Sequence, residues 1–126
     1  MKKKILVVDD DPTSLRSVEA MLILSGYEVR TSAHAEDIEQ RVKDVDPDLI
    51  VMDLMMPNID GNQAVKKLKN NPVLKGVPVI FLTALKMRDD DRGIDFEVNV
   101  ENTSYRTLTK PVDAKSLAAE IEQLTK

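Results

Sequence analysis

Short runs of apolar residues alternate along this chain with segments whose apolar residues recur every third or fourth position. Continuous runs of β-branched residues and leucine are typical of strands that are buried on both faces of a sheet. Recurrence at three and four residues is typical of amphipathic helices. The alternation therefore predicts a parallel sheet with helices on both faces, and right-handed crossovers leave few ways to connect it. The length of 126 residues suits one such domain.

The predicted strands and helices follow one another in the order that a doubly wound sheet requires. The predicted strands are residues 5–8, 27–31, 49–52, 77–82 and 106–109. The predicted helices carry apolar stripes at Leu15, Val18 and Leu22; at Ile38, Val42 and Val45; at Ala64, Val65 and Leu68; and at Leu117, Ile121 and Leu124. Asp11 and Pro12 indicate where the first helix starts, as N-cap and first-turn residue, and Gly26 indicates where it stops.

The region of residues 86–109 departs from this regular alternation. Three consecutive aspartates at 89–91 favour the start of a helix, because acidic side chains suit the positive end of the helix dipole. Gly93 soon interrupts that pattern, and residues 95–100 alternate polar and apolar with the period of a strand. We expect a short, irregular fourth helix here at most, and residues 106–109 are a weak fifth strand.

The composition excludes several classes of protein. A net charge of −4 disfavours a nucleic-acid-binding surface. The absence of cysteine rules out disulfides, a thiolate nucleophile and cysteine-ligated metals, and the single histidine, His34, rules out a histidine-rich metal site. No apolar run approaches the roughly 18 residues that span a bilayer, and the first run is too short for a signal peptide. We expect a cytoplasmic domain that contacts neither membrane nor nucleic acid.

Polar residues directly follow four of the predicted strands: Asp9 and Asp10, Asp53, Thr83, and Lys110. A parallel sheet brings these strand ends to one edge, where ligands of doubly wound folds bind. Three converging carboxylates repel one another, and Mg²⁺, which takes carboxylate ligands and shares phosphate oxygens, relieves that repulsion. A hydroxyl and an ammonium are donors that suit an anionic phosphoryl group. One of the carboxylates could itself be the nucleophile and form an aspartyl phosphate.

These residues lie in stretches that resemble the receiver domains of two-component response regulators. The matching stretches are residues 5–12 (ILVVDDDP), residues 53–57 (DLMMP) with Asp60 and Gly61, residues 78–84 (PVIFLTA), and Lys110 with Pro111. The resemblance extends over nearly the whole chain and treats residues 1–126 as one receiver domain, similar to the chemotaxis-type single-domain receivers. It implies a flavodoxin-like, doubly wound fold of five parallel strands in the order 2-1-3-4-5.

The resemblance also implies a role for each residue at the strand ends. Asp53 would accept a phosphoryl group from a histidine kinase or phosphotransfer protein. The ligands implied for Mg²⁺ are Asp9, Asp10, Asp53 and the backbone carbonyl of Met55. Thr83 would hydrogen-bond the phosphoryl group and Lys110 would pair with it. Such a domain is not an enzyme for other substrates, because it catalyses only its own phosphorylation and dephosphorylation.

The region before Lys110 departs from the family pattern. Thr103 and Ser104 stand where family members usually carry Gly-Ala, and Thr107 stands at the position of the aromatic switch residue. Thr107 is too small to fill the space that such an aromatic side chain occupies. We therefore expect an unusual output face, with residues 86–109 contacting a downstream protein or a second copy of the chain.

Two other functions remain open on the sequence alone. Residues 9–13 also fit the Asp-x-Asp-x-Thr signature of haloacid-dehalogenase-like phosphatases, which would use Asp9 and Asp11. That interpretation leaves Asp53 without a role and lacks the further acidic residues that those enzymes need after the lysine. The second alternative is a receiver-like binding module that never takes a phosphoryl group.

Overall fold

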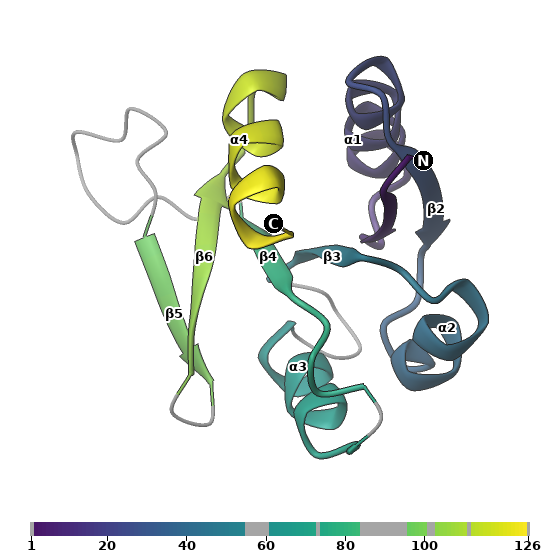
Figure 1. Cartoon of the computed structure of the whole chain (residues 1–126), viewed down its shortest axis with the longest axis vertical. Coiled ribbons are helices and arrows are strands. Elements are labelled where there is room, and N and C mark those ends of the chain that lie inside the picture. The colour runs from purple at the N-terminus through teal and green to yellow at the C-terminus, as the bar shows by residue number, and fades with distance from the viewer. Residues whose placement is uncertain are drawn as a thin grey trace.

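A six-stranded sheet with helices on both faces forms the protein in the computed structural model, which describes residues 2–54, 61–72, 74–83, 96–100, 103–110 and 112–125. The strands are β1 (Lys4–Val8), β2 (Glu28–Ser32), β3 (Leu49–Asp53), β4 (Val79–Thr83), β5 (Phe96–Val100) and β6 (Thr103–Thr109). The helices are α1 (Pro12–Leu24), α2 (Ile38–Val45), α3 (Gly61–Lys69) and α4 (Ala114–Leu124). Helices α1 and α4 lie over one face of the sheet, and α2 and α3 lie over the other (Figure 1).

Five strands are parallel and follow the order β2-β1-β3-β4-β6. Because β6 is the fifth parallel strand along the chain, this confirms the predicted 2-1-3-4-5 arrangement. The sheet also has a sixth strand, β5, which pairs antiparallel with β6 and lies at the sheet edge (Figure 1). The alternating pattern of residues 95–100 predicts a strand there, and β5 confirms it. The expected short fourth helix falls mainly on residues 84–95, which lie outside the described residues.

The local signals for helix α1 are confirmed in the structure. Asp11 is the N-cap, its side chain accepts a hydrogen bond from the backbone N–H of Thr13, and Pro12 occupies the first turn. Pro12 fits there because a first-turn residue has no helical partner for a backbone N–H. The helix ends at Leu24, and Gly26 follows with φ of +96°, a conformation that favours glycine. The chain can therefore turn sharply into β2.

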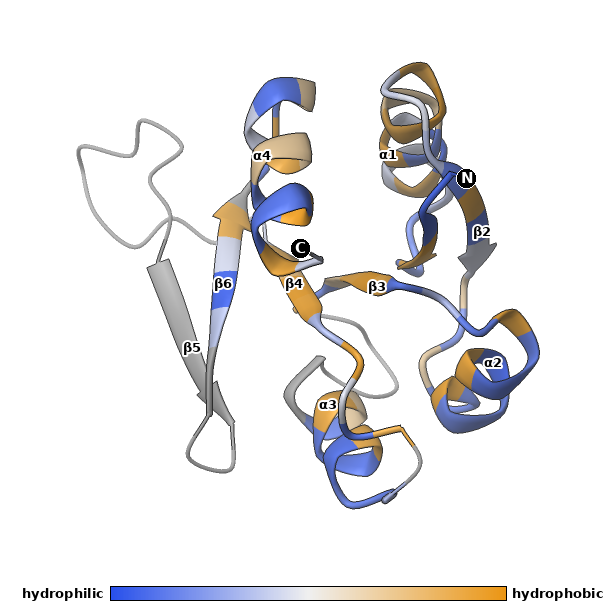
Figure 2. Cartoon of the chain, in the orientation of Figure 1, coloured by the Kyte–Doolittle hydropathy of each residue, from blue (hydrophilic) through white to orange (hydrophobic). Residues whose placement is uncertain are grey.

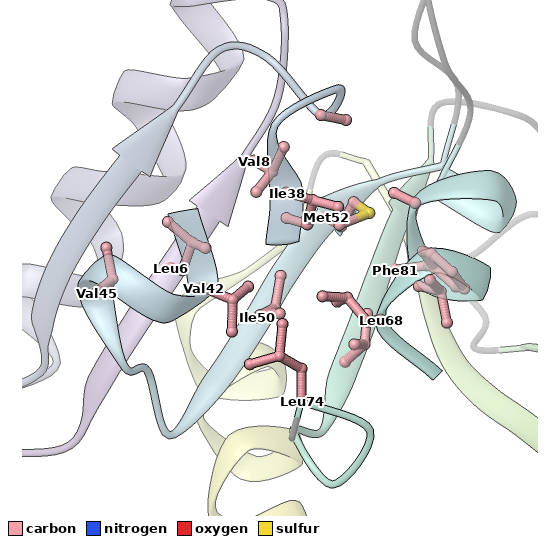
Figure 3. Packing of buried hydrophobic residues seen from close by; sticks show 14 of the residues in the cluster. Leu6, Val8, Ile38, Val42, Val45, Ile50, Met52, Leu68, Leu74 and Phe81 are labelled. Carbon is pink, nitrogen blue, oxygen red and sulfur yellow. The ribbon is translucent and has the colours of Figure 1, made fainter. Parts of the chain in front are cut away.

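Two apolar layers hold the helices to the sheet. Alternate residues of a strand point to opposite faces, so β1 contributes Ile5 and Val7 to the layer under α1 and α4, and Leu6 and Val8 to the layer under α2 and α3. The second layer appears in Figure 3, where Leu68 of α3 packs with residues of the sheet and of α2. Figure 2 shows β3 and β4 as largely hydrophobic strands, whereas each helix has hydrophobic and hydrophilic positions. Burying one large aliphatic side chain contributes roughly 1.5–3 kcal/mol, so these layers dominate stability.

Among the described residues, no helix combines the length and the apolar character that crossing a bilayer requires.

At the amino-terminal ends of the strands, a polar cluster links α4 to the residue just before β2. The Tyr27 hydroxyl donates to Glu122 Oε2 at 2.7 Å, and Lys3 Nζ contacts Glu122 Oε1 at 3.0 Å. Burial and the nearby Glu122 carboxylate raise the pKa of Tyr27 to about 12. Hydrogen bonds from Tyr27 and Lys3 lower the pKa of Glu122. Lys2, Lys3, Ser25, Gly26, Tyr27 and Glu122 line a surface hollow of about 420 Å³ at this edge.

We expect Tyr27→Phe to lower the melting temperature in a pH-dependent way. The Glu122 contribution is present above its ordinary pKa of 4.5 and is lost as pH falls below it, because the folded-state pKa is lowered. The Tyr27 contribution is present below pH 10.0 and is lost as pH rises toward about 12, because its pKa is raised. The difference in melting temperature from wild type should be greatest between these limits. Tyr105→Phe is the control, because burial alone raises the pKa of Tyr105. A difference that stays constant below pH 4.5 would contradict the assigned ion–hydroxyl bond.

Candidate functional site

Backbone hydrogen bonds continue past the strands and align their carboxyl ends. The N–H of Asp9 donates to Ser32 O at 3.1 Å, that of Leu54 to Leu82 O at 2.7 Å, and that of Lys110 to Thr83 O at 2.8 Å. Each bond extends a parallel ladder by one residue beyond a strand. Asp9 and Lys110, which directly follow β1 and β6, are therefore held at the same edge as Asp53 and Thr83, the last residues of β3 and β4.

Three carboxylates converge at this edge. Carboxylate oxygens of Asp9, Asp10 and Asp53 all lie within 4.8 Å of one another. Asp9 is only 2% exposed and Asp53 only 8%, whereas Asp10 faces solvent. Their placement follows from the sheet, because β1 and β3 are adjacent parallel strands with Val8 paired to Met52. The predicted acidic group thus exists, with two buried members and one exposed member.

Lys110 places its ammonium between the two buried carboxylates. Its Nζ lies 2.9 Å from Asp9 Oδ2 and 3.2 Å from Asp53 Oδ2. Removing paired charges from water is costly unless they are well hydrogen-bonded, and a cation that bridges two carboxylates offsets part of their repulsion. We call Asp9, Asp10, Asp53, Thr83 and Lys110 the strand-end cluster.

The pKa values of Asp9 and Lys110 both shift toward the charged forms. Burial by itself would raise the pKa of Asp9, but hydrogen bonds from the backbone N–H of Asp11, from Lys110 and from the Ser14 hydroxyl outweigh it and lower the pKa. Burial by itself would lower the pKa of Lys110, but the Asp9 and Asp53 carboxylates raise it. Both shifts favour the charged forms, so the Lys110 ammonium stands as a positive charge beside the Asp9 carboxylate.

Three predicted site residues remain, which are Thr83, Asp11 and Met55. Thr83 is fully buried and stands beside Thr109 in the ladder between β4 and β6. Asp11 points its carboxylate at the first turn of α1, where it accepts from Thr13 N at 3.2 Å. Met55, whose carbonyl the resemblance gives as a metal ligand, lies outside the described residues. Sequence reasoning missed Ser14, and its position in the first turn of the helix after the aspartates was the only available signal.

Thr107 stands at the position where the receiver domains that the sequence resembles carry an aromatic switch residue. Thr107 is fully buried and pairs in register with Phe81 of β4. Tyr105, two residues earlier, packs edge-on against Phe81 with ring centroids 5.8 Å apart. Lys69 Nζ lies 6.0 Å from the centroid of the Tyr105 ring, at the limit of a cation–π contact. The aromatic contact with Phe81 is therefore made from position 105.

A doubly wound sheet with three carboxylates, a buried threonine and a lysine at its carboxyl edge defines a class of α/β protein that can hold a phosphoryl group beside a cation. Comparison with known proteins agrees with this class. The family model described as the response regulator receiver domain matches residues 5–122. The chain belongs to the response regulator receiver domain family.

Individual relatives support the same assignment. Response regulator PleD of Caulobacter vibrioides is 38% identical over 127 residues, covering 100% of this chain and 27% of the relative. The alkaline phosphatase synthesis transcriptional regulatory protein PhoP of Bacillus subtilis is 32% identical over 124 residues, covering 98% of this chain and 49% of PhoP. The chain thus spans between about a quarter and a half of these curated relatives.

A solved structure with a similar fold carries a metal. The receiver domain of sensor histidine kinase PA1611 from Pseudomonas aeruginosa is 26% identical, with a TM-score of 0.81, and the match covers 99% of this chain and 98% of that one. That structure is described as having a magnesium ion coordinated in its active-site cleft.

Proposed function

We propose that Asp53 is the residue that accepts a phosphoryl group in a two-component phosphorelay. The observation that carries this proposal is the position of its carboxylate, within 4.8 Å of the oxygens of Asp9 and Asp10 and 3.2 Å from Lys110 Nζ. An oxygen nucleophile beside a fixed cation suits attack on a phosphorus atom, because the charge of the transferred group is neutralised as it arrives. The donor is a phosphohistidine on a histidine kinase or phosphotransfer protein.

The transfer needs only one bond made and one bond broken. A carboxylate oxygen of Asp53 attacks phosphorus, the P–N bond to the donor histidine breaks, and the released imidazole takes up a proton. Lys110 pairs with the phosphoryl oxygens, and the hydroxyl of Thr83 donates to one of them. The domain acts on itself alone, and the acyl phosphate changes the face that a downstream partner contacts, through β6 and its neighbour β5.

The donor set fits Mg²⁺, which prefers carboxylate oxygens and keeps several waters. Both oxygens of Asp9 already have partners, since Oδ1 accepts from Asp11 N at 3.0 Å and Oδ2 from Lys110. Asp10 and Asp53 would contact the metal directly, and Asp9 would contribute charge. The carbonyl of Met55 remains a proposed ligand. When bound, the metal would offset negative charge on the phosphoryl oxygens.

The phosphatase alternative is disfavoured by the position of Asp11. That mechanism needs a second acid near the first, but the Asp11 carboxylate caps α1 and is exposed. If Asp53 takes no phosphoryl group, the domain acts as a receiver-like binding module that is never phosphorylated. We also propose that residues 1–126 form one receiver domain.

The test is incubation of the chain with acetyl phosphate, with and without Mg²⁺, followed by intact-mass measurement. Wild type should gain one phosphoryl group only when Mg²⁺ is present. Asp53→Asn keeps the shape of the side chain, removes the nucleophilic carboxylate, and should gain none. Asp48→Asn, at an aspartate before β3, is the matched control and should gain one. Equal incorporation by wild type and Asp53→Asn would refute the assignment.

A further inference from the structure

The two outermost strands of the sheet, β2 and β5, differ in how their outward-facing backbone groups are protected. At one edge, β2 pairs with β1 alone, and at the other, β5 pairs with β6 alone, among the residues that the structure describes (Figure 1). An edge strand presents unpaired N–H and C=O groups and is a template for pairing with another strand. Proteins usually block such edges with charged side chains or proline.

The β2 edge is blocked by two arginines. Arg41, from α2, donates to Thr31 O at 2.8 Å, and Arg30 donates to Val29 O at 3.3 Å. Residues 28 and 32 are the ones whose backbone bonds run to β1, since Glu28 N donates to Lys3 O and Asp9 N donates to Ser32 O. The carbonyls of Val29 and Thr31 therefore face outward, and guanidinium groups occupy both. A second strand cannot add there without displacing these bonds.

The β5 edge lacks the basic residues and the proline that often protect an edge strand, and Glu97 is its one charged residue. Its five residues, Phe-Glu-Val-Asn-Val, include no lysine, arginine, proline or glycine. Three apolar residues alternate with two polar ones, and the central residue is Val98. Read from either end, the order is apolar, polar, apolar, polar, apolar. A strand with this order is complementary to a second copy of itself running in the opposite direction.

We propose that β5 pairs with β5 of a second copy of this chain, antiparallel across a two-fold axis at Val98. This register sets Phe96 opposite Val100 of the second copy, and Glu97 opposite Asn99 of the second copy. A shift by one pair along the strand would set Glu97 opposite a second Glu97, and like charges in that position destabilise a sheet. Charge thus disfavours a shift in that direction. The result is one continuous sheet of two domains, and a two-fold contact closes without forming a filament.

The observations that support this pairing lie outside the strand-end cluster. The strand-end cluster lies at the carboxyl ends of β1, β3, β4 and β6, and none of its residues belongs to β5. The contact is short, so the dimer should be weak and visible only as protein concentration rises.

The test uses Asn99, because it stands opposite the uncharged Ser104 within its own sheet. In the proposed dimer, Asn99→Lys places a lysine opposite Glu97 twice and should tighten the dimer about fivefold. Asn99→Glu places two acids together twice and should weaken it about fivefold. Sedimentation velocity over a micromolar-to-millimolar concentration range measures both. Arg30→Glu, on the β2 edge, is the matched control and should leave the dimer unchanged.

Cysteine cross-linking checks the register independently, because the chain has no cysteine of its own. Val98→Cys should form a disulfide-linked dimer on mild oxidation, since directly opposed residues lie within disulfide reach. Glu97→Cys should cross-link far less, because its copies are diagonal neighbours about 7–8 Å apart. A wild-type chain that stays monomeric at every concentration would overturn the proposal. So would a dimer that responds equally to Asn99→Lys and Asn99→Glu, or one that Arg30→Glu disrupts.

Discussion

Lys110→Met should slow phosphoryl incorporation at Asp53 by about 100-fold or more, while Asp53 remains in place. Removing one preorganised donor from a site of developing charge typically costs about 10²–10³ in rate. Lys110 Nζ is such a donor, 3.2 Å from Asp53 Oδ2 and fixed by its second contact with Asp9. Methionine keeps most of the side-chain volume and removes the charge. The measurement is the initial rate of mass gain with acetyl phosphate at saturating Mg²⁺.

Lys115→Met is the matched control for this rate. Lys115 is exposed on α4, five positions from Lys110, and the carboxyl group whose pKa it helps to lower is that of Asp113, outside the strand-end cluster. Its replacement should leave the rate within twofold of wild type, a span of about 0.4 kcal/mol. A Lys110→Met rate close to wild type would mean that the ammonium only neutralises the resting carboxylates and takes no part in transfer.

The same substitution should also reveal the repulsion that Lys110 offsets. Without Mg²⁺, Lys110→Met leaves the buried carboxylates of Asp9 and Asp53 without their shared cation. Breaking a fully buried pair costs about 3–5 kcal/mol, and partial exposure of Lys110 reduces this to about 2 kcal/mol. For a domain of this size, the melting temperature should fall by roughly 8 °C. Mg²⁺ bound at the proposed site would stabilise only the folded state, and we expect it to raise the melting temperature of Lys110→Met more than that of wild type.

A double-mutant cycle separates this repulsion from a loss of packing. Asp9→Asn in the Lys110→Met background removes one of the two carboxylates that have lost the Lys110 ammonium. It should therefore recover much of the lost stability in EDTA. In the wild-type background, Asp9→Asn breaks the 2.9 Å bond to Lys110 and should not stabilise to the same extent. Thermal melts of the four chains give the coupling free energy. Strictly additive effects would show that Lys110 and Asp9 do not depend on each other.

The strand ends could be located from the sequence because they rest on local signals. Each buried run is followed at once by a polar residue, and a parallel sheet places all such positions at one edge, so Asp9, Asp53 and Thr83 were found without coordinates. The N-cap role of Asp11 was equally local. These signals need no knowledge of which strands become neighbours.

Other features depended on contacts between distant segments and were not predictable in this way. The alternation at residues 95–100 indicated a strand, but only the pairing of Val98 with Tyr105 makes it an antiparallel edge beside β6. Leu124 fits the apolar stripe of α4, yet it is 37% exposed at the end of the helix. The ring that packs against Phe81 is that of Tyr105, a diagonal neighbour two residues before Thr107, the register partner of Phe81.

Chemical trapping locates the carboxylate that carries the phosphoryl group, which we propose is that of Asp53. Acyl phosphates are reduced by borohydride, so treating the phosphorylated chain with borohydride should convert the modified aspartate to homoserine. Peptide mass spectrometry then identifies the position. We expect homoserine at position 53 and aspartate at positions 9, 10 and 11. Homoserine at position 9 would refute Asp53 as the acceptor and favour the phosphatase-like use of Asp9.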